Sequence, residues 1–185
     1  MKQVKIAVIG GGASGMMAAI SAARCGKNVT ILEATNRVGN KILLTGNGKC
    51  NFSNLFLQDL CYYCKDYPFL NRVFEKFSPE DTKEFFEEAG MLVKEKNGYL
   101  YPLGEQASIV LDILRMELQK EKVSILTEYK VTKITKEGEG FLMESEDNRK
   151  LYFDKVILTT GGRSYAKTGS DGSGYRLAKK LGHSI

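Results

Sequence analysis

The sequence has no apolar run that approaches the roughly 20 residues needed for a membrane-spanning helix. Its apolar start, residues 4–9, is short and leads into glycines rather than into a signal-peptide cleavage site. We therefore expect a cytoplasmic protein with no membrane partner.

Histidine and cysteine are scarce, with one His and four Cys in the chain. Cys61 and Cys64 form a lone Cys-x-x-Cys pair, and His183 is far from it in sequence. Because a zinc site usually takes four ligands, we predict no metal site and interpret the pair as two part-buried thiols on a helix turn rather than as a redox or metal pair. Cys25 falls in a helical pattern and Cys50 in a polar loop.

The net charge of +5 is not concentrated in a basic block. Lys and Arg alternate with acidic residues, as at 94–96 and 133–139, and basic residues are not interleaved with aromatic ones. This pattern predicts no nucleic-acid partner, although a mild positive balance also suits an anionic cofactor. The sequence also lacks a Ser-His-Asp set or an obvious acid/base pair, so it predicts no catalytic residue.

The 43% of apolar residues are enough for the core of one domain, or of one domain plus part of another. Periodicity predicts strands at 4–9, 29–32, 91–93, 99–101, 123–126, 130–136, 140–145, 150–153 and 156–158, and helices at 13–25, 71–77, 79–89, 106–121 and 174–181. The short helical connection between the first two strands predicts that they are parallel neighbours. The middle strands after residue 123 are expected to form an antiparallel meander, and Ile109, Ile113 and Leu114 are expected to share the buried stripe of their helix.

Local signals mark several of these boundaries. Gly26 is a natural C-cap for the first helix. Ser78 followed by Pro79 begins the helix at 79–89. Asn97-Gly98 is the expected turn of a hairpin.

A glycine-rich turn follows the first strand and opens the first helix. It reads Gly10-Gly11-Gly12-Ala13-Ser14-Gly15 and matches the G-x-G-x-x-G pattern of a Rossmann-type βαβ unit. In that unit the first glycine permits the sharp turn, the second lets the backbone approach a pyrophosphate, and the third brings the helix close to the sheet. The positive end of the helix then faces the phosphates.

Glu33 closes the second strand, 23 residues after Gly10. A carboxylate at this place accepts hydrogen bonds from the ribose hydroxyls of an adenosine and repels a 2′-phosphate, which argues against NADP here. Together with the glycine turn, it predicts a dinucleotide-binding site.

The order of elements after Glu33 favours FAD over NAD. A simple NAD dehydrogenase would continue with alternating strands and helices. This chain continues with a polar loop at 34–54, whose Gly46-Asn47-Gly48 core permits close approach to a ligand, and later with the meander. An ordinary surface loop is the alternative for 34–54. The order indicates an α/β fold of the glutathione-reductase-like, FAD/NAD(P)-binding type, with a parallel sheet and an antiparallel β-meander.

Three segments carry a family resemblance: residues 39–54, which read GNKILLTGNGKCNFSN, residues 160–165, which read TGGRSY, and residues 168–175, which read TGSDGSGY. With them the whole chain resembles the bacterial aminoacetone-oxidase-like (BaiN/YhiN-type) NAD(P)/FAD-dependent oxidoreductases. The resemblance implies FAD as cofactor, with NAD(P)H as a candidate electron donor. The residues predicted to bind the cofactor are Gly10, Gly12, Ala13, Ser14, Gly15, Glu33, Ala34, Arg37, Gly39, Lys41, Thr45, Gly46, Lys49, Cys50, Asn51, Val131, Thr160, Gly161 and Gly162.

Within that set the resemblance assigns places along the cofactor. The ADP half would be held by Gly10, Gly12, Ala13, Ser14, Gly15 and Glu33, and Val131 would offer backbone groups to adenine. The ribityl chain and flavin would lie near Lys41, Thr45, Gly46, Lys49, Cys50 and Asn51, and residues 160–162 would pack at the carboxyl edge of the sheet.

The resemblance further implies one FAD-binding domain over 1–185 that stops where a large inserted domain would begin. Its expected parts are the βαβ unit at 1–33, the cofactor loop at 34–54, a helical segment at 55–122, the meander and return strand at 123–162 and a final helix at 171–182. A flavin oxidoreductase acting with NAD(P)H or oxygen on an unidentified small molecule is the first functional hypothesis. A non-catalytic dinucleotide-binding or interaction module and an NAD-dependent dehydrogenase are the alternatives, and the sequence does not predict the oligomeric state.

Overall fold

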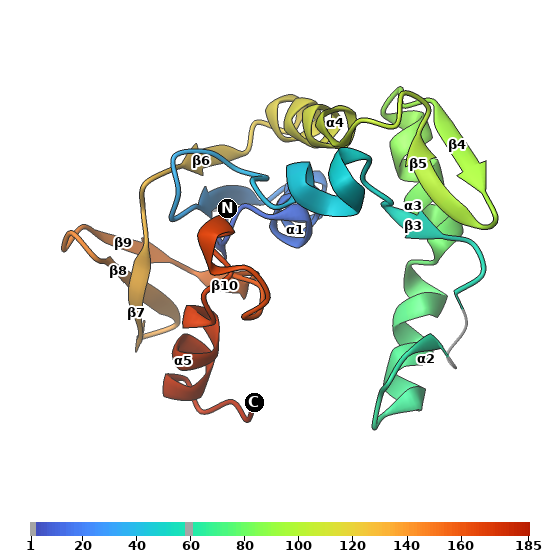
Figure 1. Cartoon of the computed structure of the whole chain (residues 1–185). Helices are drawn as coiled ribbons and strands as arrows, with labels where there is room; N and C mark the ends of the chain where they lie inside the picture. The colour runs from blue at the N-terminus through green and yellow to red at the C-terminus, as the bar shows by residue number, and fades with distance from the viewer. Residues whose placement is uncertain (1–2, 58–60) are drawn as a thin grey trace. The chain divides into compact units, whose positions relative to one another are not determined.

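The computed structural model of the chain describes residues 3–57 and 61–185, without the side chain of residue 167. The chain divides into two compact units (Figure 1). The first unit comprises Met1–Lys41 and Leu114–Ile185, and the second comprises Ile42–Ile113.

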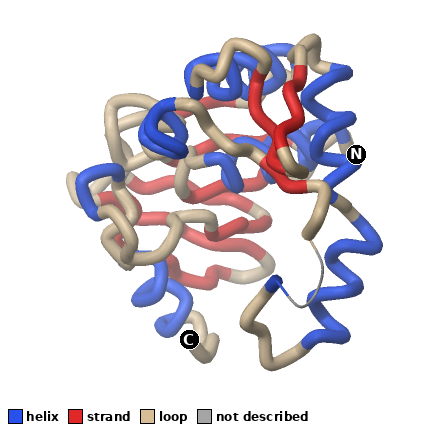
Figure 2. The backbone as a smooth tube through the Cα atoms, turned by 45° about the vertical axis from the view of Figure 1, so that its right-hand side comes forward, coloured by secondary structure: helices blue, strands red, loops and turns tan. Residues whose placement is uncertain are grey.

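A four-stranded parallel sheet forms the centre of the first unit, in the order β10-β1-β2-β6. Its strands are β1 (Lys5–Ile9), β2 (Asn28–Leu32), β6 (Ser124–Leu126) and β10 (Lys155–Leu158). Figure 2 shows these strands running side by side. Ala7, Val8 and Ile31 are fully buried, because strands inside a parallel sheet are covered on both faces. The predicted parallel pairing of the first two strands is confirmed.

Helix α1 (Ala13–Arg24) connects β1 to β2 and packs on both strands. Its buried face consists of small and flexible residues, with Met16, Ala19 and Ile20 at the core. Gly26 follows the C-cap residue in the left-handed conformation, at φ +72°, as predicted.

The second sheet of the first unit is the predicted antiparallel meander, β7 (Val131–Glu137), β8 (Gly140–Ser145) and β9 (Lys150–Phe153). Tyr129, Met143 and Phe153 are buried in one cluster with residues of the parallel sheet. Leu177 of α5 (Ser173–Lys180) belongs to the same cluster, so the last helix packs on β7.

The second unit holds η1 (Ile42–Gly48), β3 (Ser53–Asn54), α2 (Tyr67–Lys76), α3 (Pro79–Glu88), β4 (Val93–Lys96) and β5 (Tyr99–Pro102). Strands β3, β5 and β4 form a small antiparallel sheet in that order. The hairpin turns at Asn97 and Gly98, both with positive φ, as a two-residue hairpin requires. A complete capping box of Ser78 and Asp81 begins α3, which confirms the predicted start of this helix.

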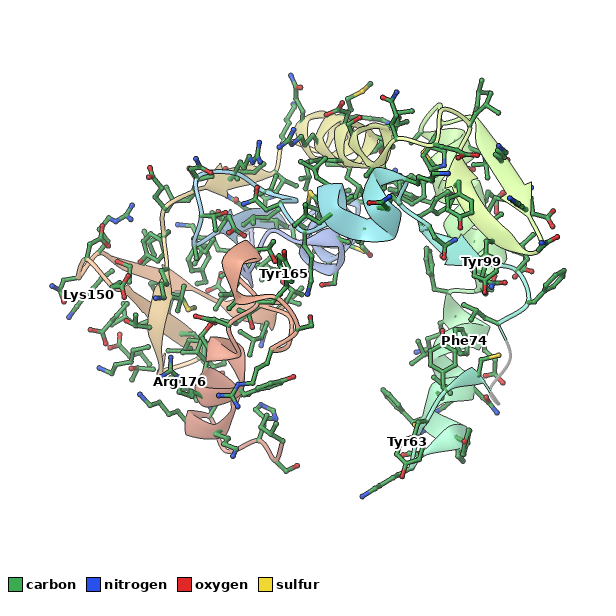
Figure 3. The ribbon with its side chains drawn as sticks, in the orientation of Figure 1. Tyr63, Phe74, Tyr99, Lys150, Tyr165 and Arg176 are labelled. Carbon is green, nitrogen blue, oxygen red and sulfur yellow. The ribbon has the colours of Figure 1, made fainter. Side chains whose placement is uncertain are left out.

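Helix α2 is longer than predicted, because Asp66 caps it by accepting a hydrogen bond from the Phe69 amide. It has no buried residue, and Phe69 and Val73 of its apolar face are exposed. Phe74 of this helix, labelled in Figure 3, forms a tilted ring pair with Tyr62.

Helix α4 (Ala107–Lys120) corrects one prediction. Leu114 is buried, but Ile109 and Ile113 are only half-buried. The buried stripe runs instead through Ala107, Val110, Leu111, Leu114 and Leu118. The predicted helix is confirmed, but its buried face was assigned to the wrong stripe. Apolar residues occur on two neighbouring stripes of the helix, and the sequence alone does not say which one faces the core.

Two smaller predictions also need correction. Cys61 is exposed rather than part-buried, whereas Cys64 is half-buried, and both thiols are free. The final helix occupies Ser173–Lys180 and is therefore shorter than 171–182. In the described ranges 3–57 and 61–185, no helix is long and apolar enough to cross a membrane.

Candidate dinucleotide-binding site

The glycine turn lies between β1 and α1, where two of its glycines are required by the packing of the chain itself. Gly10 has φ +102°, and a Cβ atom there would lie 2.7 Å from the carbonyl oxygen of Thr159. A Cβ atom on Gly15 would lie 1.9 Å from the carbonyl oxygen of Gly10. Both therefore serve the roles that the sequence predicted for them, a sharp turn and close contact between helix and strand.

Gly12 is different, because nothing in the described part of the chain explains its lack of a side chain. It is the N-cap of α1, with φ −76° and ψ −173°, an extended conformation open to any residue. No atom lies within 4 Å of a Cβ atom built there. The other 18 of the 19 glycines, all in the described ranges, have either a positive φ or a neighbour inside that distance. The space beside Gly12 is therefore free to receive a ligand.

The first turn of α1 beside this space is suited to an anion. The N-cap makes no side-chain hydrogen bond, and the first turn contains no acidic residue. Ala13 and Ser14 are exposed there. Uncapped N–H groups and the positive end of the helix dipole attract phosphate, so this turn can hold a pyrophosphate.

Glu33 follows β2, and its carboxylate points at the glycine turn, as predicted. It is 8% exposed. Its Oε2 accepts a hydrogen bond from the Gly11 amide at 2.7 Å. Its Oε1 accepts hydrogen bonds from the Thr35 amide at 2.8 Å and the Thr35 hydroxyl at 2.7 Å. These three donors fix a buried negative charge at the mouth of the turn.

The segment after Glu33 is attached to the same turn. The Gly39 amide donates to the Gly11 carbonyl at 2.8 Å. A Cβ atom on Gly11 would lie 2.4 Å from Cγ1 of Val38, so this glycine is needed for the loop to approach. Exposed Ala34 and Arg37 lie on this segment, and Arg37 Nε donates to Asn40 Oδ1 at 2.6 Å. Gly11, Thr35 and Val38 were missed by the sequence analysis, since their roles come from contacts across the turn.

The predicted residues after β10 lie beside β1, at the carboxyl edge of the parallel sheet. The Thr159 amide donates to the Ile9 carbonyl at 2.9 Å. Gly161 has φ +72°, and a Cβ atom on Gly162 would lie 2.9 Å from the Tyr175 hydroxyl. Thr160 lies against the start of α5, where a Cβ atom on Gly174 would meet its hydroxyl at 1.8 Å. In open α/β sheets, ligands bind outside this edge.

Lys41 and Val131 complete the predicted residues of the first unit. The Lys41 ammonium donates to the hydroxyls of Ser164 at 2.7 Å and Ser170 at 3.1 Å. Val131 is buried at the start of β7. It follows closely after Tyr129, whose amide donates to the Glu33 carbonyl at 2.9 Å. The start of the meander is thus attached to the end of β2.

The remaining predicted residues, Thr45, Gly46, Lys49, Cys50 and Asn51, belong to the second unit. Within it, Gly46 has φ +54° and the Cys50 amide donates to the Thr45 carbonyl at 3.3 Å. Burial raises the pKa of the Cys50 thiol above its ordinary value. The Asn51 amide group donates to the Leu100 carbonyl at 3.0 Å, which joins the loop to β5.

Lys49 takes part in an ion-pair cluster around Glu105. The Glu105 carboxylate pairs with the Lys49 ammonium at 2.8 Å and also with Lys94. Hydrogen bonds from these two lysines lower the pKa of Glu105 to about 2, and the same carboxylate raises the pKa of Lys49. Glu105 itself was not predicted, because its partners lie far away in sequence.

The sequence of the chain matches a known protein family. Residues 4–185 match the family described as HI0933-like protein Rossmann domain. The chain belongs to this family.

The curated relatives include enzymes with different substrates. The chain is 43% identical to the 3-dehydro-bile acid delta(4,6)-reductase of Clostridium scindens over 183 residues, which cover 98% of this chain and 44% of the relative. It is 27% identical to the ribosomal RNA dihydrouridine synthase of Escherichia coli over 186 residues, covering 100% of this chain and 46% of the relative. The chain thus spans about half the length of the curated relatives it matches.

Solved structures show the same fold at low sequence identity. A flavocytochrome c3 fumarate reductase matches with a TM-score of 0.69 and 16% identity over 99% of this chain and 41% of its own. A 3-ketosteroid-delta4-(5alpha)-dehydrogenase from Rhodococcus jostii matches with a TM-score of 0.63 and 17% identity over 86% of this chain and 46% of its own. The chain therefore has an α/β, Rossmann-like fold with parallel and antiparallel sheets. The predicted fold class and family resemblance are confirmed.

Proposed function

We propose that this chain binds FAD and contributes the nucleotide-binding part of a flavin-dependent oxidoreductase. The observation that carries the proposal is the space at Gly12, which neither backbone conformation nor packing explains. A ligand that approaches the start of α1 accounts for a glycine at that position.

The first unit offers a place for each part of the ADP half. The pyrophosphate would meet the amides of the first turn of α1, around Gly12 and Ser14. The adenosine ribose would hydrogen-bond to the Glu33 carboxylate, which the Gly11 amide holds beside that turn. The backbone at Val131 would face adenine, and residues 160–162 would border the cofactor at the sheet edge.

The buried charge of Glu33 also selects against one nucleotide. A 2′-phosphate placed beside a carboxylate that is 8% exposed would be repelled in a low-dielectric environment. The site therefore suits FAD or NAD rather than NADP, and the order of elements after Glu33, with its antiparallel meander, favours FAD. NAD(P)H or oxygen would act as the second redox partner of the bound FAD, outside this nucleotide-binding site.

The second unit would contribute to the flavin end. Its η1 contains left-handed residues at Gly46 and Asn47, which expose backbone groups. Lys49, whose ammonium pairs with Glu105, follows directly after η1. A cation placed near the flavin would stabilise negative charge on the reduced ring. Bound FAD would supply hydride transfer, while these residues would orient the ring and exclude water.

The names of the relatives favour the reductive direction. One relative is called a reductase and two are called dihydrouridine synthases. We therefore propose that the whole enzyme transfers hydride from the reduced flavin to an organic acceptor. Because the basic residues of this chain are scattered among acidic ones, a small-molecule acceptor is favoured over RNA.

The test is the visible absorption spectrum of the purified chain after addition of FAD and gel filtration. We expect flavin bands to remain with the protein and to bleach on addition of NADH. Gly12→Val should lose most of the retained flavin while the melting temperature stays near that of the parent, because its side chain enters open space. Gly15→Ala should instead lower the melting temperature, because its Cβ atom would meet the Gly10 carbonyl.

Three results would contradict the proposal. A colourless protein that binds NAD would indicate a dehydrogenase, and one that binds nucleotide without bleaching would indicate a non-catalytic module. Full flavin retention by Gly12→Val would show that the cofactor does not approach α1.

A further inference from the structure

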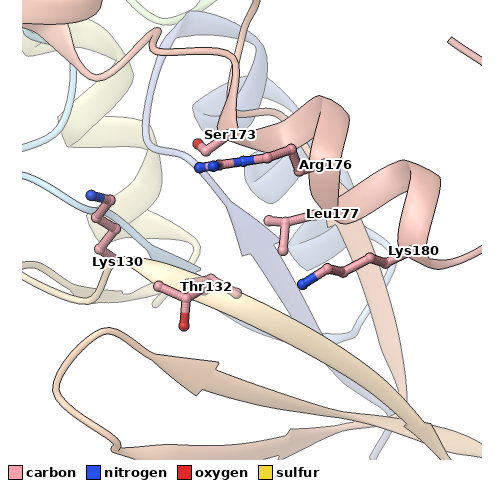
Figure 4. A pocket seen from close by; sticks show the side chains of 7 residues that line it. Lys130, Thr132, Ser173, Arg176, Leu177 and Lys180 are labelled. Carbon is pink, nitrogen blue, oxygen red and sulfur yellow. The ribbon is translucent and has the colours of Figure 1, made fainter.

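A cavity of about 240 Å³ lies in the first unit between the start of β7 and helix α5 (Figure 4). Its lining residues are Lys130, Val131, Thr132, Ser173, Arg176, Leu177 and Lys180. They comprise three cations, two hydroxyl side chains and two aliphatic side chains, without a carboxylate. Such a lining is suited to an anion.

The positive charge of this cavity is only partly neutralised by its surroundings. Lys130 pairs with Glu146 at 3.3 Å outside the lining. Asp171, next to α5, accepts a hydrogen bond from the Ser173 amide at 2.8 Å. Arg176 and Lys180 are exposed, and neither makes an ion pair with any residue in the described part of the chain.

Arg176 and Lys180 lie four residues apart on α5, so they share one exposed face of the helix, beside Leu177, which is buried against β7. In Figure 4 both side chains extend across the cavity toward the strand. Like charges at this spacing disfavour the helix unless an anion lies between them. A guanidinium fork and an ammonium on one face are also the pair of groups that phosphate oxygens accept well.

We propose that this cavity binds a phosphomonoester of a small molecule. Three cations complement the double negative charge of a phosphomonoester better than the single charge of a carboxylate ligand. Val131 and Leu177 provide apolar surface for the small organic part of the ligand. The volume lies just below the roughly 300–1,000 Å³ typical of pockets for drug-sized ligands. The cavity shares Val131 with the proposed adenine contact, so the proposal is tested on the chain without FAD.

The experiment is a titration of the isotope-labelled full chain with sodium phosphate at constant ionic strength, followed by amide NMR. We expect saturable shifts confined to 130–132 and 173–180. Arg176→Gln and Lys180→Gln should each weaken binding roughly five- to tenfold, because each removes a charge-assisted contact. The matched control is Lys179→Gln, which removes the same charge from an exposed residue of the same helix outside the lining. It should leave the affinity unchanged.

A second titration with 2′-AMP separates the sources of the phosphate. Tighter binding than that of inorganic phosphate, with added shifts at Val131 and Leu177, would indicate a phosphorylated metabolite, and equal affinity would indicate free phosphate. Equal loss of affinity in all three variants would overturn the proposal, because it would show only screening of surface charge. Binding of a single-stranded oligonucleotide with no response to phosphate or 2′-AMP would also overturn it.

Discussion

At the scale of the residue, Glu33 is the group whose chemistry depends most on its surroundings. Burial of a carboxylate is costly unless hydrogen bonds replace water. Here the donors are the Gly11 amide and the amide and hydroxyl of Thr35. They hold the carboxylate in place in the absence of ligand, so little ordering is required when a ribose binds.

Glu33→Gln is expected to weaken FAD binding roughly 10- to 100-fold, because charge-assisted hydrogen bonds contribute about 1.5–3 kcal/mol. Its new NH₂ group would also face an N–H donor, so a lower melting temperature is expected. Isothermal titration with FAD measures the affinity.

Glu117→Gln provides the matched control for this change. Glu117 is also a buried glutamate of the first unit, and it pairs with Arg24 at 2.6 Å. We expect lower stability with unchanged FAD affinity. Equal loss of affinity in both variants would show that Glu33 acts only through the fold.

The residues that sequence reasoning found at this site are those with a local signal. Gly10, Gly12 and Gly15 stand at fixed spacing between a strand and a helix, and Glu33 ends the next strand. Gly11 could not be assigned a role, because its requirement comes from Val38, which returns to the turn 27 residues later.

At the scale of the element, the loop from η1 to β3 is fastened by ionic contacts as well as by its backbone. Glu105 follows β5 with a left-handed φ of +48° and joins Lys49 of the loop to Lys94 of β4. Because these three residues lie on separate segments, the cluster connects the loop to the small sheet of the second unit.

This cluster predicts a pH dependence of stability. The pKa of Glu105 falls from 4.5 to about 2 in the folded chain. Its contribution is therefore complete above pH 4.5 and is lost as the pH falls from 4.5 through about 2. We expect Glu105→Gln to melt below the parent at pH 6, with a difference that narrows as the pH falls through this window.

Circular dichroism melts from pH 2 to 7 measure this difference. Glu75→Gln, a change at an exposed glutamate of α2 in the same unit, should show no such narrowing. Parallel curves for the parent and Glu105→Gln would contradict the role of the cluster.

Helix and strand boundaries were predictable where a cap or turn residue marks them, as at Ser78 and Asn97. The buried face of α4 was not, because Ile109 and Leu111 are equally apolar and only tertiary packing selects between them. The kink inside η1, where Thr45 is extended and Gly46 left-handed, also has no periodic signal.

At the scale of the whole molecule, the predicted cofactor residues are divided between the two units. Those for the ADP half lie in the first unit, and those for the flavin end lie in the second, apart from Lys41, which belongs to the first. The sequence predicted the fold class because each βαβ signal is local. It did not predict the division, which depends on contacts distributed over the chain.

This division predicts which part of the cofactor stabilises the first unit. FAD at 100 times its dissociation constant should add about 2.7 kcal/mol to the free energy of unfolding of the part that binds it. ADP should raise the melting temperature as well, whereas FMN, which lacks the adenosine, should have little effect. Thermal melts with each ligand measure this, and stabilisation by FMN equal to that by FAD would refute the assignment of the ADP half.

The strand order has a consequence for biosynthesis. Strand β1 lies between β2 and β10, and the latter ends at Leu158. At about 5–20 residues per second, a ribosome takes roughly 6–25 s to proceed from the end of β2 to the end of β10. Throughout that interval one edge of the nascent β1 has no hydrogen-bonding neighbour. The growing polypeptide therefore depends on chaperones, or on transient contacts that cover this edge, to avoid pairing with another chain.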